Sequence, residues 1–110
     1  MFEDCRVYLS NSLADDFRII RNKFPALSDS ELVNEMINAL YEQFYIQHIK
    51  IPKANIEKTN SQPIRTRIRY SYKSYHRVQR FKQDFKKTDA KLIRALLPLY
   101  RMKVMGGFKN

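Results

Sequence analysis

The residues best suited to chemistry form a run of arginines and tyrosines in the second half of the chain. Arginine stands at every second position from 65 to 69, and further cations and tyrosines follow up to residue 80. The set consists of Arg65, Arg67, Arg69, Tyr70, Tyr72, Lys73, Tyr75, Arg77 and Arg80. Cations neutralise phosphates and release counterions, and a tyrosine can stack on a base or donate a hydrogen bond. The pattern therefore predicts a surface that binds a polyanion.

The uneven distribution of charge supports the same prediction. Residues 1–45 carry 4 Lys and Arg against 8 Asp and Glu, a net charge of −4. Residues 46–110 carry 17 against 3, a net charge of +14, and the whole chain has a net charge of +10. A polyanion is attracted to the second half and weakly repelled by the first. Charge alone does not distinguish DNA from RNA as the partner.

Patterns typical of enzymes, metal sites and cofactor sites are missing from the sequence. His48 and His76 are 28 positions apart and there is one cysteine, so no zinc-site spacing occurs. Both glycines stand at positions 106–107, which excludes a glycine-rich phosphate loop. Asp15 and Asp16 form a carboxylate pair, but we expect them on the polar, solvated side of a helix. We therefore expect no catalytic residues, no metal and no cofactor.

The composition also bears on the compartment. No run of about 18 apolar residues is present, so no membrane span is expected. The first ten residues are acidic rather than basic, unlike a secretory signal. A single cysteine fits a reducing, cytoplasmic setting, and we expect Cys5 to be a small buried hydrophobe on a strand.

The periodicity of the first half predicts one strand followed by two helices. Residues 5–9 alternate with the two-residue period of a half-buried strand. A helix follows, with N-cap chemistry at residues 10–12 and its end at Pro25. Its apolar stripe consists of Leu13, Phe17, Ile20 and Phe24.

The second helix is predicted from a capping box, in which Glu31 follows Ser28 by three residues. Its apolar stripe is Leu32, Val33, Met36, Ile37, Leu40 and Phe44. A stripe this wide buries more surface than one neighbouring helix covers. It therefore predicts either an intertwined dimer or a central place within the chain. The core or dimer contacts expected in this half are Val7, Leu9, Leu32, Met36, Ile37 and Leu40.

The second half begins with a linker and continues with a strand and two helices. Residues 49–63 are largely polar and end in a proline. Residues 64–72 alternate β-favouring residues with arginines, which predicts a strand. A basic amphipathic helix follows, and then a helix that Thr88 or Asp89 caps and that Pro98 is expected to break or kink. The predicted organisation is a unit at 1–48, a linker at 49–63, a basic unit at 64–104 and a tail at 105–110.

Two short segments carry a family resemblance. Residues 7–13 (Val-Tyr-Leu-Ser-Asn-Ser-Leu) match an apolar-x-Leu-polar-x-x-Leu junction between a strand and a helix. Residues 28–33 match a Ser-Glu-apolar-apolar opening of a second helix. Over residues 4–44 the chain thus resembles the ribbon–helix–helix family of DNA-binding proteins, which includes the Arc and Met repressors. The resemblance implies a mainly α fold with a short β-ribbon, in which two chains pair their strands and the ribbon enters the major groove.

The resemblance also implies roles for individual residues. Cys5, Val7 and Leu9 would face the core. The bases would be contacted by Asp4, Arg6 and Tyr8. Arg6 suits guanine because its fork bonds two acceptors at once. The start of the second helix would bind a phosphate through Ser28, Asp29 and Ser30. Asp4 and Asp29 depart from the expected pattern, because phosphate repels a carboxylate.

The second half can also be aligned on the first as a degenerate repeat. A shift of 61 residues matches the apolar positions of the first strand and helix, and a shift of 60 matches those of the second helix. A true repeat would make each chain its own pseudo-dimer, with Arg65, Arg67 and Arg69 on the outer face of the second strand. Two mismatches count against it: Leu13 meets Ser74, and Asn38 meets Pro98. The alternative is an ordinary dimer of the N-terminal unit that carries a basic helical extension.

Together these patterns predict a sequence-specific DNA-binding protein that acts as a transcriptional repressor or as an accessory factor at plasmid transfer or partition sites. The expected DNA contacts are Arg6, Tyr8, Ser28, Ser30, Arg65, Arg67, Arg69, Lys73, Arg77 and Arg80. The expected partners are double-stranded DNA and further copies of the chain, in a homodimer or higher homo-oligomer, without a membrane. The alternative is an antitoxin-like or adaptor protein that dimerises and binds an acidic protein or RNA through its basic half.

Overall fold

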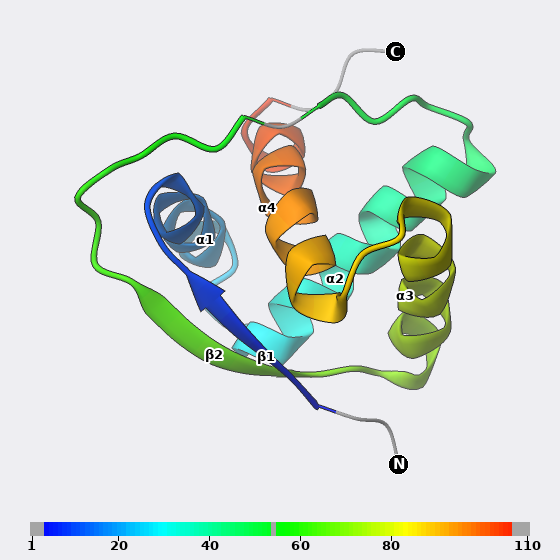
Figure 1. Cartoon of the computed structure of the whole chain (residues 1–110), viewed down its shortest axis with the longest axis horizontal. Coiled ribbons are helices and arrows are strands. Elements are labelled where there is room, and N and C mark those ends of the chain that lie inside the picture. Colours follow the sequence, from blue (N-terminus) through cyan, green and yellow to red (C-terminus); the bar gives the residue numbers. More distant parts are fainter. Residues whose placement is uncertain (1–3, 54, 107–110) are drawn as a thin grey trace.

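The computed structural model describes residues 4–53 and 55–106, and within them the fold is mainly helical with a short antiparallel β-ribbon (Figure 1). The elements are β1 (Asp4–Leu9), α1 (Ser12–Lys23), α2 (Asp29–Tyr41), a π-helical turn (Glu42–Ile46), β2 (Ile64–Arg69), α3 (Tyr72–Phe85) and α4 (Asp89–Met105). The predicted fold class is confirmed at this level. Of the predicted tail at 105–110, residues 107–110 lie outside the described part of the chain.

The two strands of the ribbon come from opposite halves of the sequence. β1 pairs antiparallel with β2, with Asp4 opposite Arg69, Arg6 opposite Arg67, and Leu9 opposite Ile64. The strand predicted at 64–72 is therefore confirmed for Ile64–Arg69. It ends sooner than predicted because the hydroxyl of Ser71 accepts a hydrogen bond from the Ser74 N–H and caps α3.

The ribbon has one buried face and one exposed face, as the period of two requires. The buried face carries Cys5, Val7, Leu9 and Ile68, with Ile64 and Thr66 partly covered. Cys5 is a buried residue on a strand, as expected, and its burial raises the pKa of the thiol. The exposed face carries Asp4, Arg6, Tyr8, Arg65, Arg67 and Arg69.

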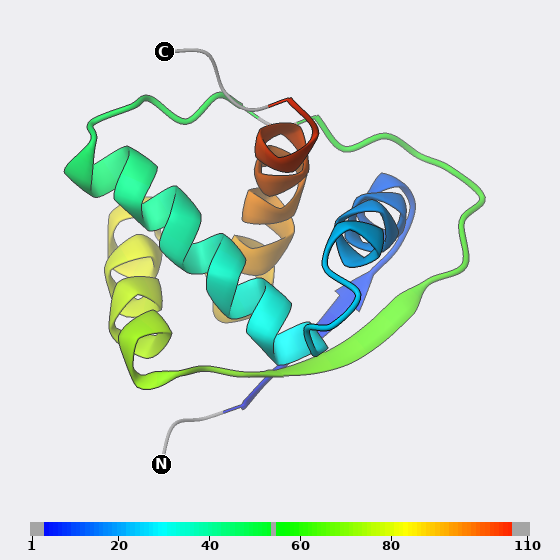
Figure 2. The ribbon, with the colours of Figure 1, turned by 180° about the vertical axis from the view of Figure 1, so that it is seen from behind.

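The helices cover the inner face of the ribbon and pack crosswise between the two halves of the sequence. β1 packs against α4, while β2 packs against α2. α1 lies against α4 and α2 lies against α3, so one core draws on both halves (Figures 1 and 2). Five residues of the wide stripe of α2 are buried within this single chain: Leu32, Val33, Met36, Ile37 and Leu40. Of the two arrangements predicted for α2, the central place within the chain is the one observed.

Of the three helix starts predicted from capping residues, two agree with the structure. The capping box of α2 is present, because Ser28 and Glu31 exchange hydrogen bonds of 3.1 and 2.9 Å. Thr88 caps α4, and Ser71 caps α3. The N-cap position of α1 differs: Asn11 has a φ of 55° and makes no side-chain cap bond. Its Oδ1 accepts from the Thr59 N–H instead, and so holds the linker.

Two further expectations about helices are corrected. Pro98 does not end the last helix, since α4 runs through it to Met105. Asp16 does not lie on a solvated face: it is buried, and its Oδ1 is 2.8 Å from the Nε of Arg101. This ion pair joins α1 to α4. Burial raises the pKa of Asp16, although the nearby Arg101 acts in the opposite direction.

The linker is attached to α1 along part of its length. The Ser12 N–H donates to the Glu57 carbonyl at 3.0 Å, and the Glu57 N–H donates to the Ser12 hydroxyl at 2.8 Å. Arg18 donates to the carbonyl of Gln62 at 2.6 Å. The linker passes over the edge of the molecule opposite the ribbon before it returns to β2 (Figure 1). This path delivers β2 antiparallel to β1. None of the helices in the described ranges is long and apolar enough to cross a membrane.

Candidate nucleic-acid interface

The exposed face of the ribbon brings together residues from two segments about 60 positions apart. Four arginines, one tyrosine and one aspartate project from it. Arg6 and Arg67 stand directly opposite each other at the centre of the ladder. Two like charges in direct opposition destabilise a ribbon unless an anion lies nearby. A negatively charged group near the Arg6–Arg67 pair would therefore stabilise the ribbon.

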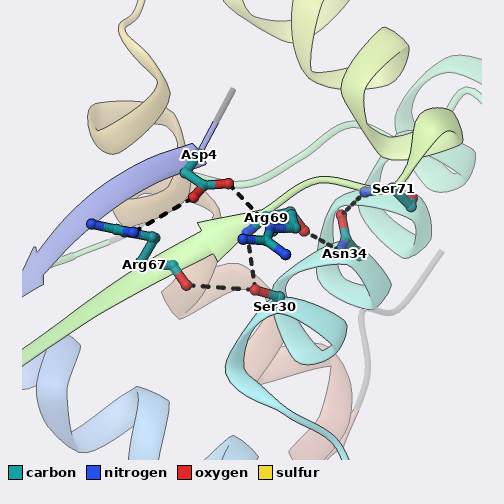
Figure 3. A network of polar contacts seen from close by, with 6 residues as sticks. All are labelled: Asp4, Ser30, Asn34, Arg67, Arg69 and Ser71. Atoms are coloured by element: carbon teal, nitrogen blue, oxygen red, sulfur yellow. Dashed lines mark hydrogen bonds and ion pairs between the residues drawn. The ribbon is translucent and has the colours of Figure 1, made fainter. Parts of the chain in front are cut away.

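One end of this face supplies part of that negative charge internally. Asp4 lies between two arginines, with its Oδ1 3.4 Å from the Nε of Arg69 and its Oδ2 3.8 Å from an Nη of Arg67 (Figure 3). Both arginine side chains are more than half exposed. Exposed pairs of this kind are weak and readily exchange partners. The arginines can therefore move from Asp4 to an incoming phosphate or base.

The other end of the face is formed by a cation and an aromatic ring. The guanidinium carbon of Arg65 lies 5.1 Å from the centre of the Tyr8 ring, within cation–π range. Between the two ends an open hollow is lined by Arg6, Val7, Tyr8, Arg65, Thr66 and Arg67. The two ends of the exposed face are thus chemically different, with Asp4 and Arg69 at one and Tyr8 and Arg65 at the other.

The backbone of β2 is fixed to the start of α2 by polar side chains. The Ser30 hydroxyl accepts from the Arg69 N–H at 2.9 Å, and lies 3.5 Å from the Arg67 carbonyl, to which it donates. Asn34 donates to the Arg69 carbonyl at 3.0 Å and accepts from the Ser71 N–H at 3.2 Å (Figure 3). These bonds fix the end of the strand, so the arginines project from a supported backbone.

The residues predicted to anchor a phosphate at the start of α2 are used inside the fold. Ser28 belongs to the capping box, and hydrogen bonds from its N–H and hydroxyl lower the pKa of Glu31. Ser30 holds β2. Asp29 accepts from Thr66 at 2.7 Å and pairs with Arg21 at 2.9 Å. A phosphate contact by Ser28 or Ser30 stays a prediction, and it would have to share these atoms.

Two of the cations predicted on the helix after the ribbon, Arg77 and Arg80, contact α2 and the π-helical turn. Arg77, whose side chain is 15% exposed, packs 4.5 Å from the centre of the Tyr41 ring and donates to Asn38 Oδ1 at 3.2 Å. Arg80 lies 3.9 Å from the centre of the Tyr45 ring. These contacts fasten α3 to α2 and to the π-helical turn. Lys73 is exposed near the start of α3.

Tyr70, which the sequence places among the polyanion-binding residues, is buried. Its hydroxyl donates to Asp89 at 2.8 Å, and burial raises its pKa. It therefore cannot stack on a base in this structure. The sequence did not predict the hydrogen bond of Tyr70, the contacts of Asn34 with the end of β2, or those of Tyr41 with the arginines of α3. Their partners are between 19 and 39 positions away, where neither periodicity nor spacing gives a signal.

Neither metal ligation nor similarity to known proteins adds to this picture. In the part of the chain that is described, no three His, Cys, Asp or Glu side chains come together as a metal site would require. Comparison of the chain with protein-family models, with curated proteins and with solved structures yields no match.

Proposed function

We propose that this chain is a DNA-binding protein of ribbon–helix–helix type in which one polypeptide supplies both strands of the ribbon. The observation that carries the proposal is the pairing of β1 with β2, which gathers Arg6, Arg65, Arg67 and Arg69 on one exposed face. A two-stranded ribbon fits the major groove of B-DNA, and an arginine fork matches the two acceptors of guanine.

The register of the ribbon supports a tandem repeat with a pseudo-twofold axis. A shift of 61 residues equates Arg6 with Arg67, and these two residues are paired in the ladder. The same shift equates Asp4 with Arg65 and Tyr8 with Arg69, and the ladder pairs Asp4 with Arg69 and Tyr8 with Arg65. The register is therefore symmetric about the Arg6–Arg67 pair, as in a ribbon made by two equivalent units.

The packing of the helices is consistent with the same symmetry. Each half consists of a strand followed by two helices. Each strand packs against the last helix of the other half, β1 against α4 and β2 against α2. Two subunits of a ribbon–helix–helix dimer would interlock in this way.

The resemblance then offers two uses, as a transcriptional repressor or as an accessory factor at plasmid transfer or partition sites. Because tandem units in one chain occur among conjugation accessory proteins of this family, the repeat favours the second use.

The proposal predicts that the arginines of β2 dominate DNA binding. Replacing Arg65, Arg67 and Arg69 by Ala should weaken binding to a selected duplex at least about tenfold more than Arg6→Ala does. The log–log salt slope should fall by about 0.9 for each phosphate that the variant no longer neutralises. The matched control replaces Lys23, Lys50 and Lys58 by Ala, which removes the same charge from exposed positions off the ribbon. Binding is measured at three salt concentrations. Equal losses in the two triple variants would reduce the effect to net charge and contradict the proposed face.

A further inference from the structure

A second hollow is lined by residues of the linker, the π-helical turn, the end of α3 and the middle of α4, and by none of the ribbon. Its volume is about 400 Å³. Leu92, Leu96 and Leu99 of α4 line one side, and Phe44 and Phe85 line another. This volume falls within the range of small-molecule sites, which are mostly apolar with a few polar groups at defined places.

The linker contributes both apolar and charged groups to this hollow. Ile51 and Ile56 extend the apolar lining, and Lys53 and Lys87 are its two charged residues. Ile56 is 57% exposed and Phe85 is 41% exposed, so large apolar surfaces meet water at this place. A ligand that covered them would gain about 25 cal/mol for each Å² of apolar surface removed from water.

The charge of the hollow selects the type of ligand. Two lysines contribute to it, and none of the described lining residues is Asp or Glu. A ligand with a carboxylate would form charge-assisted hydrogen bonds with these ammonium groups, whereas a neutral ligand would not. A second copy of this chain is disfavoured as the occupant, since it would bring a net charge of +10 towards the same lysines.

We propose that this hollow binds a small amphipathic carboxylate, with its apolar body against α4 and its carboxylate between Lys53 and Lys87. This site is separate from the ribbon and does not depend on the proposed DNA binding. The apolar side chains supply most of the affinity, and the two lysines supply the preference for an anion.

The test uses decanoate as the probe and 1-decanol as its uncharged counterpart. Ile and Leu methyl groups are followed by NMR during titration of the full chain. Decanoate should shift the methyl signals of Ile51, Leu96 and Leu99 in a saturable way and leave Leu9 unchanged. 1-Decanol should bind about tenfold more weakly, which corresponds to about 1.4 kcal/mol.

Three variants separate the contributions to binding. Lys53→Gln with Lys87→Gln should weaken decanoate about tenfold and leave 1-decanol unchanged, while Lys50→Gln with Lys58→Gln should change neither. Ala95→Phe fills the hollow and should abolish both titrations. The proposal is overturned if the shifts do not saturate, if the two probes bind equally, or if the Lys50 and Lys58 variants lose affinity as well. It is also overturned if the same methyl signals shift with protein concentration alone while the molecular mass doubles, because the occupant is then a second copy.

Discussion

Asp4 is the one acid on the exposed face of the ribbon, which otherwise carries four arginines and a tyrosine. It neutralises part of the charge of Arg67 and Arg69, and its side chain is 27% exposed. A phosphate that approaches this end of the ribbon must compete with the carboxylate and is repelled by it. If this face binds DNA as proposed, Asp4 lowers its general affinity for a polyanion, and the remaining acceptor capacity of the carboxylate suits the amino group of cytosine.

Replacing Asp4 by Asn should strengthen binding to unselected duplex DNA several-fold, because it removes the repulsion and releases both guanidinium groups. The salt slope should steepen by up to about 0.9, the contribution of one further neutralised phosphate. Titrations of wild type and variant at three salt concentrations measure both effects. Glu35→Gln, at an exposed position on α2, changes the net charge by the same amount and serves as the control. If both variants gain affinity equally, Asp4 has no special position on the binding face.

Asp16 gives a prediction about pH. Burial raises its pKa above the unfolded value of 3.8, so folding favours the protonated carboxyl. Its contribution to stability is therefore full below the unfolded pKa and decreases as pH rises through the folded pKa. The free energy of unfolding of wild type, relative to Asp16→Asn, should accordingly fall as pH rises above about 3.8.

Denaturant unfolding at several pH values measures this difference. Arg101→Met removes the partner that lowers the pKa of Asp16, so it should extend the decrease to higher pH. A wild-type advantage that grows with pH would show instead that the ion pair outweighs burial.

At the scale of elements, the strands and helices follow from the sequence because each has a clear period and defined ends. The two-residue alternation in β2 and the capping box of α2 predict their structures without reference to other elements. The polar contacts between elements do not follow in this way. Asn34 reaches Ser71, and Arg80 reaches Tyr41, across 37 and 39 positions. The alternation therefore placed the arginines of β2 on an exposed face correctly, whereas Arg77 and Arg80 hold helices together, which no local pattern indicates.

α2 is the element on which the core depends most directly. Met36 is 1% exposed and belongs to the cluster shared by both halves. Met36→Asp would bury a charge without a partner, at a cost on the order of 3 kcal/mol or more. Urea unfolding followed by circular dichroism measures this loss. Glu35→Asp changes the exposed neighbouring position and should alter stability by less than about 0.5 kcal/mol. A Met36→Asp variant as stable as wild type would contradict the observed packing.

At the scale of the whole molecule, the two strands of the ribbon come from one chain and differ in sequence. In a dimer of identical chains the twofold axis forces both ends of the exposed face to be the same. Here one end has Asp4 with Arg69 and the other has Tyr8 with Arg65. The strand pairing is centred on the Arg6–Arg67 pair, and the chemistry at its two ends differs.

This difference predicts that the preferred DNA site is not palindromic. Selection from a random duplex pool should give half-sites of different sequence around the position of the Arg6–Arg67 pair. Replacing Asp4 and Tyr8 together by Arg would place two arginines at each end of the face, and the selected sites should then become more nearly palindromic. Lys23→Arg with Lys50→Arg adds arginine away from the ribbon and should leave the selected sequence unchanged. If wild type selects a palindrome, two copies of the chain contact the DNA around a true twofold axis, and the single-chain ribbon does not by itself determine the site.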